Sequence, residues 1–289
     1  MTILPESLHK LYPFENHFYK QDHHKQHYID EGKGETIIMV HGNPTWSFYY
    51  RNLVLHLRNH YRCIVPDHIG CGLSDKPSNY PYQLETHINN LENLVTHLGI
   101  KRFHLIVHDW GGPIGLGIAF KNPQRLMKLV ILNTAAFLSS EIPLRLQLCR
   151  APLLGTIMVR GLNLFSRLAT RIAVQKKIPP EVKSAYLFPY NNWENRIAVL
   201  RFIEDIPLHP SHSTYRVLQK IETTLSKIQN NPALICWGGK DFVFTEHFFN
   251  RWKTYLPHAQ THHFPDAGHY ILEDVSKEIP PLISQFFNQ

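Results

Sequence analysis

The stretch VHDWGG, residues 107–112, places an aspartate at a tight turn. An apolar run ends at His108, Asp109 follows, and Gly111 and Gly112 lead into a segment with helical spacing. Glycines at such a turn let a helix pack closely on the strand before it. The pattern predicts that the Asp109 carboxylate projects beside a helix N-terminus, whose dipole favours the ionised form. Taken alone, the same pattern also fits a helix N-cap aspartate.

A carboxylate in that position is suited to attack on a saturated carbon. The product is an alkyl ester, which activated water can hydrolyse at the carbonyl of the aspartate itself. A serine would form an ether instead, and the enzyme would be trapped. Asp109 therefore predicts covalent catalysis, provided that the chain also supplies a base and a group that orients the base.

Two residues fit those roles by their order in the chain. Strand, sharp turn and helix around Asp109 resemble the nucleophile elbow of the α/β-hydrolase fold, in which nucleophile, acid and histidine follow one another. Asp241 in WGGKD follows a predicted strand at 234–238, and His269 in DAGH follows the last predicted strand. We expect Asp241 to orient His269 and stabilise its charged form. The alternatives are a turn aspartate and an ordinary histidine.

Two donors are placed to stabilise a leaving group that departs as an anion. Trp110 carries an indole N–H next to Asp109, and Asn43 carries an amide on the HGNP loop. Neither supplies an acidic proton, so the pair suits a halide or another anion that leaves without protonation. A packing tryptophan and a loop-shaping asparagine are the alternatives. We interpret His41, in the same loop, as a structural hydrogen bonder.

The order of elements predicts how these residues are positioned. Short β-rich segments alternate with segments of helical length, which is typical of a mostly parallel sheet covered by helices on both faces. The predicted strands are 24–32, 35–40, 61–67, 103–108, 125–133, 232–239 and a last one at THHF (261–264), and the main predicted helices are 47–59, 83–98, 110–121 and one at the C-terminus. The 289 residues suffice for one such domain with an insertion.

The alternation breaks between residues 138 and 210. This stretch is apolar with helical spacing, carries regularly placed arginines, and has prolines at its hinges. We expect a helical cap at 138–210, inserted between core segments 1–137 and 211–289. Packing of the cap on the core accounts for its apolar stripe. Contact with a second copy, an enzyme assembly or a membrane surface is the alternative.

Composition excludes several other classes of protein. No apolar run is long enough to span a bilayer, and the N-terminus lacks the pattern of a signal peptide, so we expect a cytoplasmic protein. The formal charge of +7 comes without a Lys/Arg block or a nucleic-acid motif, so we expect no nucleic-acid partner. The four cysteines, Cys63, Cys71, Cys149 and Cys236, are too sparse for a disulfide framework.

Histidines also give no sign of a metal centre. His23, His24 and His27 lie close together, but no closing ligand follows at a recognisable spacing. We interpret this stretch as an exposed strand with mixed facing, and we expect neither a metal nor a cofactor.

The motifs together resemble those of the haloalkane dehalogenases. They are HGNPTWSFYYR, VPDHIGCGLSDKP, VHDWGG, WGGKD and DAGH, and they span the core. The resemblance implies an α/β-hydrolase fold with an eight-stranded sheet, a triad of Asp109, Asp241 and His269, and a halide clamp formed by Asn43 and Trp110. A second dehalogenase subgroup has a glutamate after the sixth strand, where this chain has none.

Related families remain as alternatives. HGNPTWSFYYR and DHIGCGLSDKP also resemble the β-lactone decarboxylases of olefin biosynthesis, in which the aspartate would open a β-lactone and a cis-olefin and CO2 would leave. Epoxide hydrolases share HDWGG but need cap tyrosines, for which Tyr186, Tyr190 and Tyr215 are available. A complete Asp–His–Asp set argues against a non-catalytic binding protein. The sequence thus predicts a dehalogenase-like hydrolase for small apolar substrates, with lactone decarboxylation as the main alternative.

Overall fold

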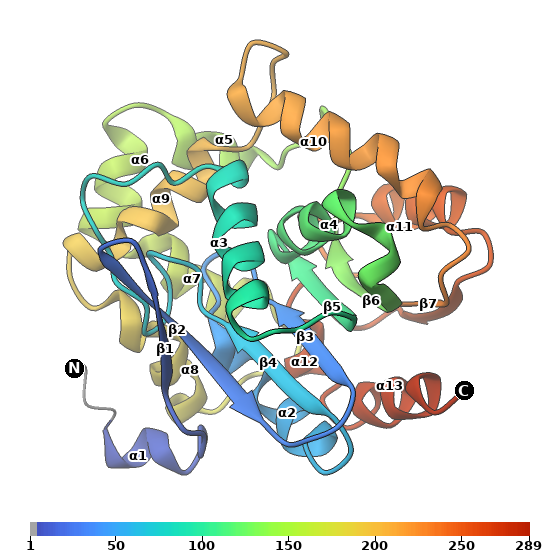
Figure 1. Ribbon diagram of the computed structural model, residues 1–289. Helices are drawn as coiled ribbons and strands as arrows, with labels where there is room; N and C mark the ends of the chain where they lie inside the picture. The colour runs from blue at the N-terminus through green and yellow to red at the C-terminus, as the bar shows by residue number, and fades with distance from the viewer. Residues whose placement is uncertain (1–4) are drawn as a thin grey trace.

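The computed structural model describes residues 5–289 and has an eight-stranded sheet at its centre. The strand order is β1-β2-β4-β3-β5-β6-β7-β8 (Figure 1). β2 runs antiparallel to its neighbours β1 and β4, and the remaining pairs are parallel. The strands are β1 His17–Gln21, β2 His24–Glu31, β3 Thr36–Val40, β4 Arg62–Pro66, β5 Phe103–Asp109, β6 Leu126–Thr134, β7 Ala233–Gly238 and β8 Gln260–Phe264. The mostly parallel sheet is the one predicted from the sequence.

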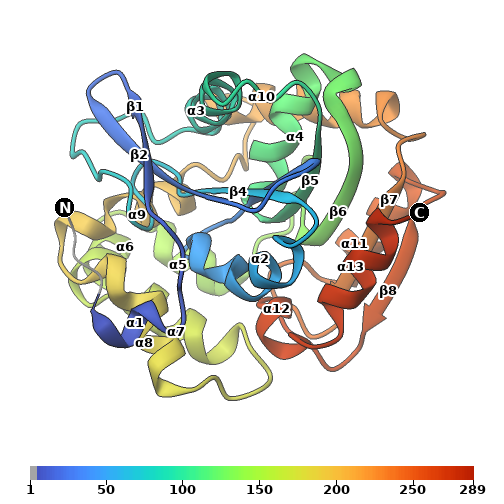
Figure 2. The same ribbon diagram turned by 60° about the horizontal axis from the view of Figure 1, so that its bottom comes forward.

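Helices cover both faces of the sheet (Figure 2). One face carries α3, α4, α10 and α11, and the opposite face carries α2 and α13, each over its own apolar cluster. Their bounds are α2 Arg51–Leu57, α3 Leu84–His97, α4 Gly111–Lys121, α10 Ser213–Thr224, α11 Glu246–Tyr255 and α13 Ile279–Phe287. The short α1 and α12 are Glu6–His9 and Ile271–Asp274, and 3-10 turns lie at Ser47–Tyr50, Pro123–Arg125, Phe188–Tyr190, Glu194–Arg196 and Leu225–Lys227.

A second group of helices lies between β6 and β7 in the sequence. They are α5 Leu144–Arg150, α6 Leu154–Thr156, a π-helical turn Ile157–Gly161, α7 Leu164–Ile172, α8 Pro180–Leu187 and α9 Ile197–Glu204. Side chains from α5 and α7 share a cavity with residues that follow β3, β5 and β8, so these helices lie over the carboxyl ends of the strands. The division of the chain at residues 138 and 210 stays a prediction.

Burial on both faces explains the composition of the central strands. Every residue of β5 and of β7 is buried, as their nearly continuous apolar sequences require. The prediction of an exposed strand around His27 was wrong, because β2 lies between β1 and β4 and its centre is covered. The four cysteines are buried and free.

Asp67, directly after β4, is the hub of the buried polar contacts beneath β2. His27 Nδ1 donates to Asp67 Oδ2 at 2.8 Å. The backbone N–H groups of Ser47 and Leu73 donate to the same carboxylate at 2.7 Å and 2.8 Å. Burial acts to raise the pKa of Asp67, but the charge and hydrogen bond of His27 and the hydrogen bond from the Leu73 N–H lower it overall. Asp67 therefore connects β2 with two loops at the carboxyl edge of the sheet.

Within residues 5–289, none of the helices is both long and apolar enough to cross a membrane. The first four residues, which belong to the N-terminal segment used to predict a cytoplasmic location, lie outside the described part of the chain.

We predict that Asp67→Ala destabilises the fold severely. The substitution leaves a buried histidine and two buried N–H groups without their acceptor, which costs about 3–5 kcal/mol. Urea unfolding followed by circular dichroism measures the change. Asp266→Ala is the control, because that carboxylate pairs with Lys240 in full solvent and its loss should not alter the transition. Equal midpoints for the two variants would refute the structural role of Asp67.

Candidate active site

Asp109 is the last residue of β5 and has a left-handed backbone conformation with φ of 52°. This conformation is uncommon outside glycine, and it turns the chain from β5 into α4 while presenting the side chain at the end of the strand. Two glycines make room for it. A Cβ at Gly42 would overlap the Asp109 carboxylate, and one at Gly111 would overlap the Val40 carbonyl. The Thr134 hydroxyl donates to the Asp109 backbone carbonyl.

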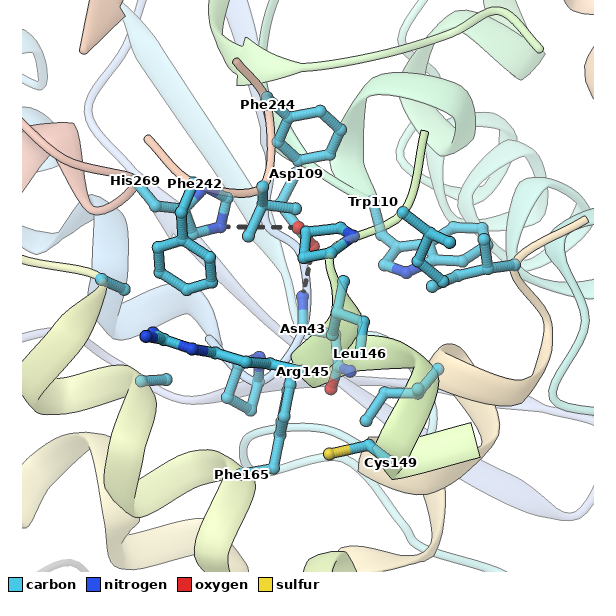
Figure 3. Close-up of a pocket in the computed structure, with 18 of the residues that line it drawn as sticks. Asn43, Asp109, Trp110, Arg145, Leu146, Cys149, Phe165, Phe242, Phe244 and His269 are labelled. Carbon is cyan, nitrogen blue, oxygen red and sulfur yellow. Dashed lines mark hydrogen bonds and ion pairs between the residues drawn. The ribbon is translucent and has the colours of Figure 1, made fainter. Parts of the chain in front are cut away.

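The structure brings Asp109, Asp241 and His269 together at the carboxyl edge of the sheet, at the end of β5 and after β7 and β8. His269 Nδ1 donates to Asp241 Oδ2 at 2.8 Å, and His269 Nε2 lies 3.5 Å from Asp109 Oδ2. The Asn43 backbone N–H donates to the other Asp109 oxygen at 2.7 Å. Figure 3 shows the contacts of Asp109 with His269 and Asn43, and all four residues are buried.

The two carboxylates determine the charge of the histidine. Burial acts to lower the pKa of His269, but the charge of Asp241 and the hydrogen bonds to both aspartates raise it to about 10. For Asp109, burial acts to raise the pKa, and the hydrogen bond and charge of His269 bring it below its usual value. At neutral pH Asp109 is therefore ionised and His269 is protonated.

The two predicted leaving-group donors also reach this site. Trp110 lines the adjacent cavity, and its ring packs on Phe202 of α9 at 5.5 Å between centroids. Asn43 lines the cavity too, but its Nδ2 donates to the Val199 carbonyl at 3.1 Å. The Asn43 Oδ1 is buried without a hydrogen-bond partner among the described residues. Because an amide nitrogen carries two N–H groups, one N–H of Asn43 remains for a ligand.

Asn133 is a site residue that sequence reasoning missed. Its Nδ2 donates to Asp241 Oδ2 at 3.0 Å, the same oxygen that accepts from His269. Its Oδ1 accepts from the Gly238 backbone N–H at 2.8 Å, which holds the amide in that orientation. Its place in the sequence was the available signal. Asn133 ends the predicted strand 125–133, and the next predicted strand along the chain, 232–239, precedes Asp241.

Two further histidines act as structural hydrogen bonders. Burial and the neighbouring charge of His269 lower the pKa of His108 to about 3, so it is neutral. Its Nε2 lies 2.8 Å from the His269 carbonyl, to which it donates. His41 Nδ1 donates to the Gly42 carbonyl at 2.8 Å, which confirms the role predicted for His41.

An apolar cavity of about 380 Å³ opens from the Asp109 carboxylate. Core residues around Asp109 form one end, and side chains of α5 and α7, such as Leu146 and Phe165, form the walls (Figure 3). Ile172 of α7 also lines the cavity. A cavity of this size and polarity accepts a small or medium apolar ligand. The polar groups at its inner end would then contact the reacting atoms.

The tyrosines considered as cap donors lie elsewhere. Tyr186 donates to Glu273, Tyr190 donates to the Thr45 carbonyl, and among the described residues neither these nor Tyr215 lines the cavity. Proton donation from the cap to an alkoxide therefore has no support in the geometry. In residues 5–289 no group of three or more histidine, cysteine or acidic side chains is arranged to hold a metal ion.

Comparison with known proteins gives relatives along nearly the whole chain. The family described as "alpha/beta hydrolase fold" matches residues 35–275. A cis-3-alkyl-4-alkyloxetan-2-one decarboxylase of Shewanella oneidensis is 50% identical, over 96% of this chain and 90% of the relative. Haloalkane dehalogenase 2 of Mycobacterium tuberculosis is 30% identical, over 96% of each chain.

A solved structure supports the same fold. The haloalkane dehalogenase DbeA of Bradyrhizobium elkani superimposes with a TM-score of 0.87, at 22% identity, over 95% of this chain and 98% of the other. The strand order, the turn at Asp109 and the family match therefore agree. The chain belongs to the α/β-hydrolase fold family, with relatives named as β-lactone (oxetan-2-one) decarboxylases and as haloalkane dehalogenases.

Proposed function

We propose that this enzyme opens a cis-3,4-dialkyl β-lactone and releases a cis-olefin and CO2, with Asp109 as the nucleophile. The observation that carries the proposal is the Asp109 carboxylate at the inner end of an apolar cavity, with His269 Nε2 3.5 Å from one of its oxygens. The decarboxylase relative is also far more similar to this chain than the dehalogenase relative. The sequence motifs alone favoured dehalogenation, with decarboxylation as the main alternative.

The first step is attack of the Asp109 carboxylate on ring carbon C4 of the lactone. A bond forms between an Asp109 oxygen and C4, and the bond between C4 and the ring oxygen breaks. The ring oxygen leaves as part of a carboxylate that stays attached to C3. This step resembles halide displacement, because a saturated carbon is attacked and an anion departs without a proton.

The second step returns Asp109 to its starting state. The bond between C3 and the carboxylate carbon breaks, CO2 leaves, and the electron pair forms the C3–C4 double bond while the Asp109 ester oxygen is expelled. Backside attack in a small ring places the new ester bond opposite the carboxylate, which is the alignment that elimination needs. The alkyl groups stay on the same side, so a cis-lactone yields a cis-olefin. No water is consumed.

In this scheme His269 acts by its charge. A protonated His269 close to Asp109 stabilises the aspartate when it leaves as a carboxylate in the second step. Asp241 holds His269 in place and keeps it protonated. Trp110 and the free N–H of Asn43 would stabilise the carboxylate released from the ring.

Haloalkane dehalogenation is the second candidate. The same aspartate and the same pair of N–H donors suit a halide, and the dehalogenase relative covers the same length of chain. The difference lies in the second step. Once the halide has departed, an alkyl ester remains on Asp109, and only water can remove it. His269 would then have to lose its proton and act as a base, which becomes easier once Asp109 is esterified and uncharged.

We also infer the setting of the enzyme. The substrate is apolar and of small molecular size, no cofactor or metal is needed for either scheme, and we place the reaction in the cytoplasm. Residues 138–210 would act as the cap that covers the substrate. Association with a second copy or with other enzymes through this cap remains a proposal.

His269→Ala is predicted to separate the two chemistries. With a bromoalkane, the variant should form the Asp109 ester and stop, because no base activates water. With the lactone it should still release olefin, about ten- to a hundredfold more slowly, since one charged hydrogen bond to the leaving Asp109 is lost. Mass spectrometry of the Asp109 peptide and gas chromatography of the olefin measure both.

His263→Ala is the control for that experiment, because this exposed histidine pairs with Glu246 outside the site. It should process both substrates as the parent enzyme does. An adduct elsewhere with Asp109 unmodified would disprove the nucleophile. Loss of olefin formation in His269→Ala while the lactone-derived ester accumulates on Asp109 would disprove a water-free second step.

Trp110→Phe should slow departure of either anion. The variant keeps a smaller aromatic ring but loses the N–H, so we expect an about ten- to hundredfold lower rate of ring opening or halide release in single-turnover kinetics. Trp193→Phe is the control, because that tryptophan is exposed and packs on Arg160. Unchanged rates in the Trp110 variant would mean that Trp110 only packs.

Asn133→Asp should move the acid limb of the pH profile. The variant keeps an oxygen for the Gly238 N–H but replaces the amide that donates to Asp241 by a second carboxylate. Two adjacent carboxylates raise the pKa of the pair, so kcat/KM should fall at about one pH unit higher than in the parent enzyme. An unshifted profile would show that Asn133 does not act through Asp241.

A further inference from the structure

Exposed large apolar side chains are concentrated in one short part of the chain. In residues 5–289, most of those that are exposed fall between 144 and 168, and the exceptions are Phe18, Trp193 and Leu208. We call the concentrated set the cap leucine surface, and it consists of Leu144, Leu148, Leu153, Leu154, Ile157, Leu162 and Leu168. Leu153 is 74% exposed and Leu144 is 69% exposed. Large apolar side chains gathered on an exposed part of a protein are typical of a contact site.

The charged residues in the same part of the chain are all basic. Residues 142–180 contain no aspartate or glutamate. Exposed basic residues accompany the leucines, and among the described residues none of them forms an ion pair; they are Arg145, Arg167, Arg171, Lys176 and Lys177. An apolar surface with unpaired positive charges is complementary to an anionic lipid bilayer.

One backbone feature keeps a leucine in solvent. Leu153 has φ of 63° and ψ of −52°, and the Leu154 N–H donates to the Pro152 carbonyl at 2.7 Å. This is a γ-turn of the rare and strained kind. Packing of Leu153 inside the protein does not compensate for the strain, because its side chain is exposed. A contact outside the chain would compensate for it.

The cap leucine surface also borders the mouth of the cavity. Leu148 and Leu168 both line the cavity and are 46% and 37% exposed, and Arg145 lines it while being exposed as well. The entrance therefore opens between α5 and α7, on the surface that carries the unpaired charges. An apolar molecule dissolved in a bilayer would meet this entrance directly.

We propose that the cap leucine surface binds an anionic lipid bilayer, with the leucines in the interfacial region and the basic residues at the headgroups. A protein partner fits less well, because the energetic centres of protein interfaces are rich in Trp, Tyr and Arg and poor in Leu. The proposal is independent of the catalytic assignment, since binding to vesicles is measured without turnover.

The test is cosedimentation of the full chain with phosphatidylcholine vesicles, with and without an equal part of phosphatidylglycerol. We expect binding to the anionic vesicles, much weaker binding to phosphatidylcholine alone, and a decrease with added salt. Arg167→Gln/Arg171→Gln should lower the partition coefficient about thirtyfold, since each arginine near an anionic surface contributes about a factor of five. Leu153→Glu/Leu154→Glu should lower it at least about tenfold, because each substitution adds a negative charge and removes an apolar side chain that would enter the bilayer.

Phe18→Glu is the matched control, because it places the same charge at an exposed apolar residue on β1. It should bind vesicles as the parent chain does. Thermal unfolding of all variants confirms that each is folded. Absence of vesicle binding, or binding that the leucine and arginine variants leave unchanged, would overturn the proposal. So would a chain that ignores vesicles but self-associates through Leu153 and Leu154, which would make this surface an interface between copies.

Discussion

One positive charge held between two buried carboxylates determines the chemistry of this protein. His269 lies 2.8 Å from Asp241 and 3.5 Å from Asp109, and all three side chains are buried. His269 and the Asn43 backbone N–H both lower the pKa of Asp109, and an ionised Asp109 is the nucleophile that both candidate reactions need.

The surrounding structure maintains this arrangement. Asn133 and His269 donate to the same Asp241 oxygen, and His108 fixes the backbone that carries His269. The glycine of the HGNP loop lets Asn43 bring its backbone N–H to Asp109. Each contact comes from the end of a different strand or from the loop after it. The strands β3, β5, β6, β7 and β8 therefore all have to be in place before the site is complete.

Much of this could be predicted from the sequence, because parallel strands end at one edge of a sheet. Asp109, Asp241 and His269 each follow an apolar strand, so their strand positions alone place them near one another. The Asn43 amide could not be predicted in the same way. Its bond to the Val199 carbonyl depends on how α9 packs, which local sequence does not determine. The burial of His27 likewise depends on residues outside β2. β1 pairs with one edge of β2, and Asp67 follows β4, which pairs with the other edge.

Apolar residues of the cap show a second limit of sequence reasoning. Helical spacing in residues 142–174 predicts an amphipathic segment but does not state what its apolar face meets. In the structure Phe165 and Ile172 line the cavity, whereas Leu153 and Leu162 are exposed. Leu153 lies in the γ-turn before α6, whereas the residues that line the cavity lie on α5 and α7 or near them. Apolar residues of this one segment thus form part of the cavity wall and part of the outer surface.

The central claim is that Asp109 is esterified at a saturated carbon and is then expelled without water. Turnover of a cis-β-lactone in H₂¹⁸O, followed by mass spectrometry of the Asp109 peptide, tests it most directly. The account predicts that cis-olefin accumulates while the Asp109 carboxylate stays unlabelled. A bromoalkane serves as the positive control, because water attack on the ester would place the label in Asp109. Entry of ¹⁸O into Asp109 during lactone turnover would contradict the account.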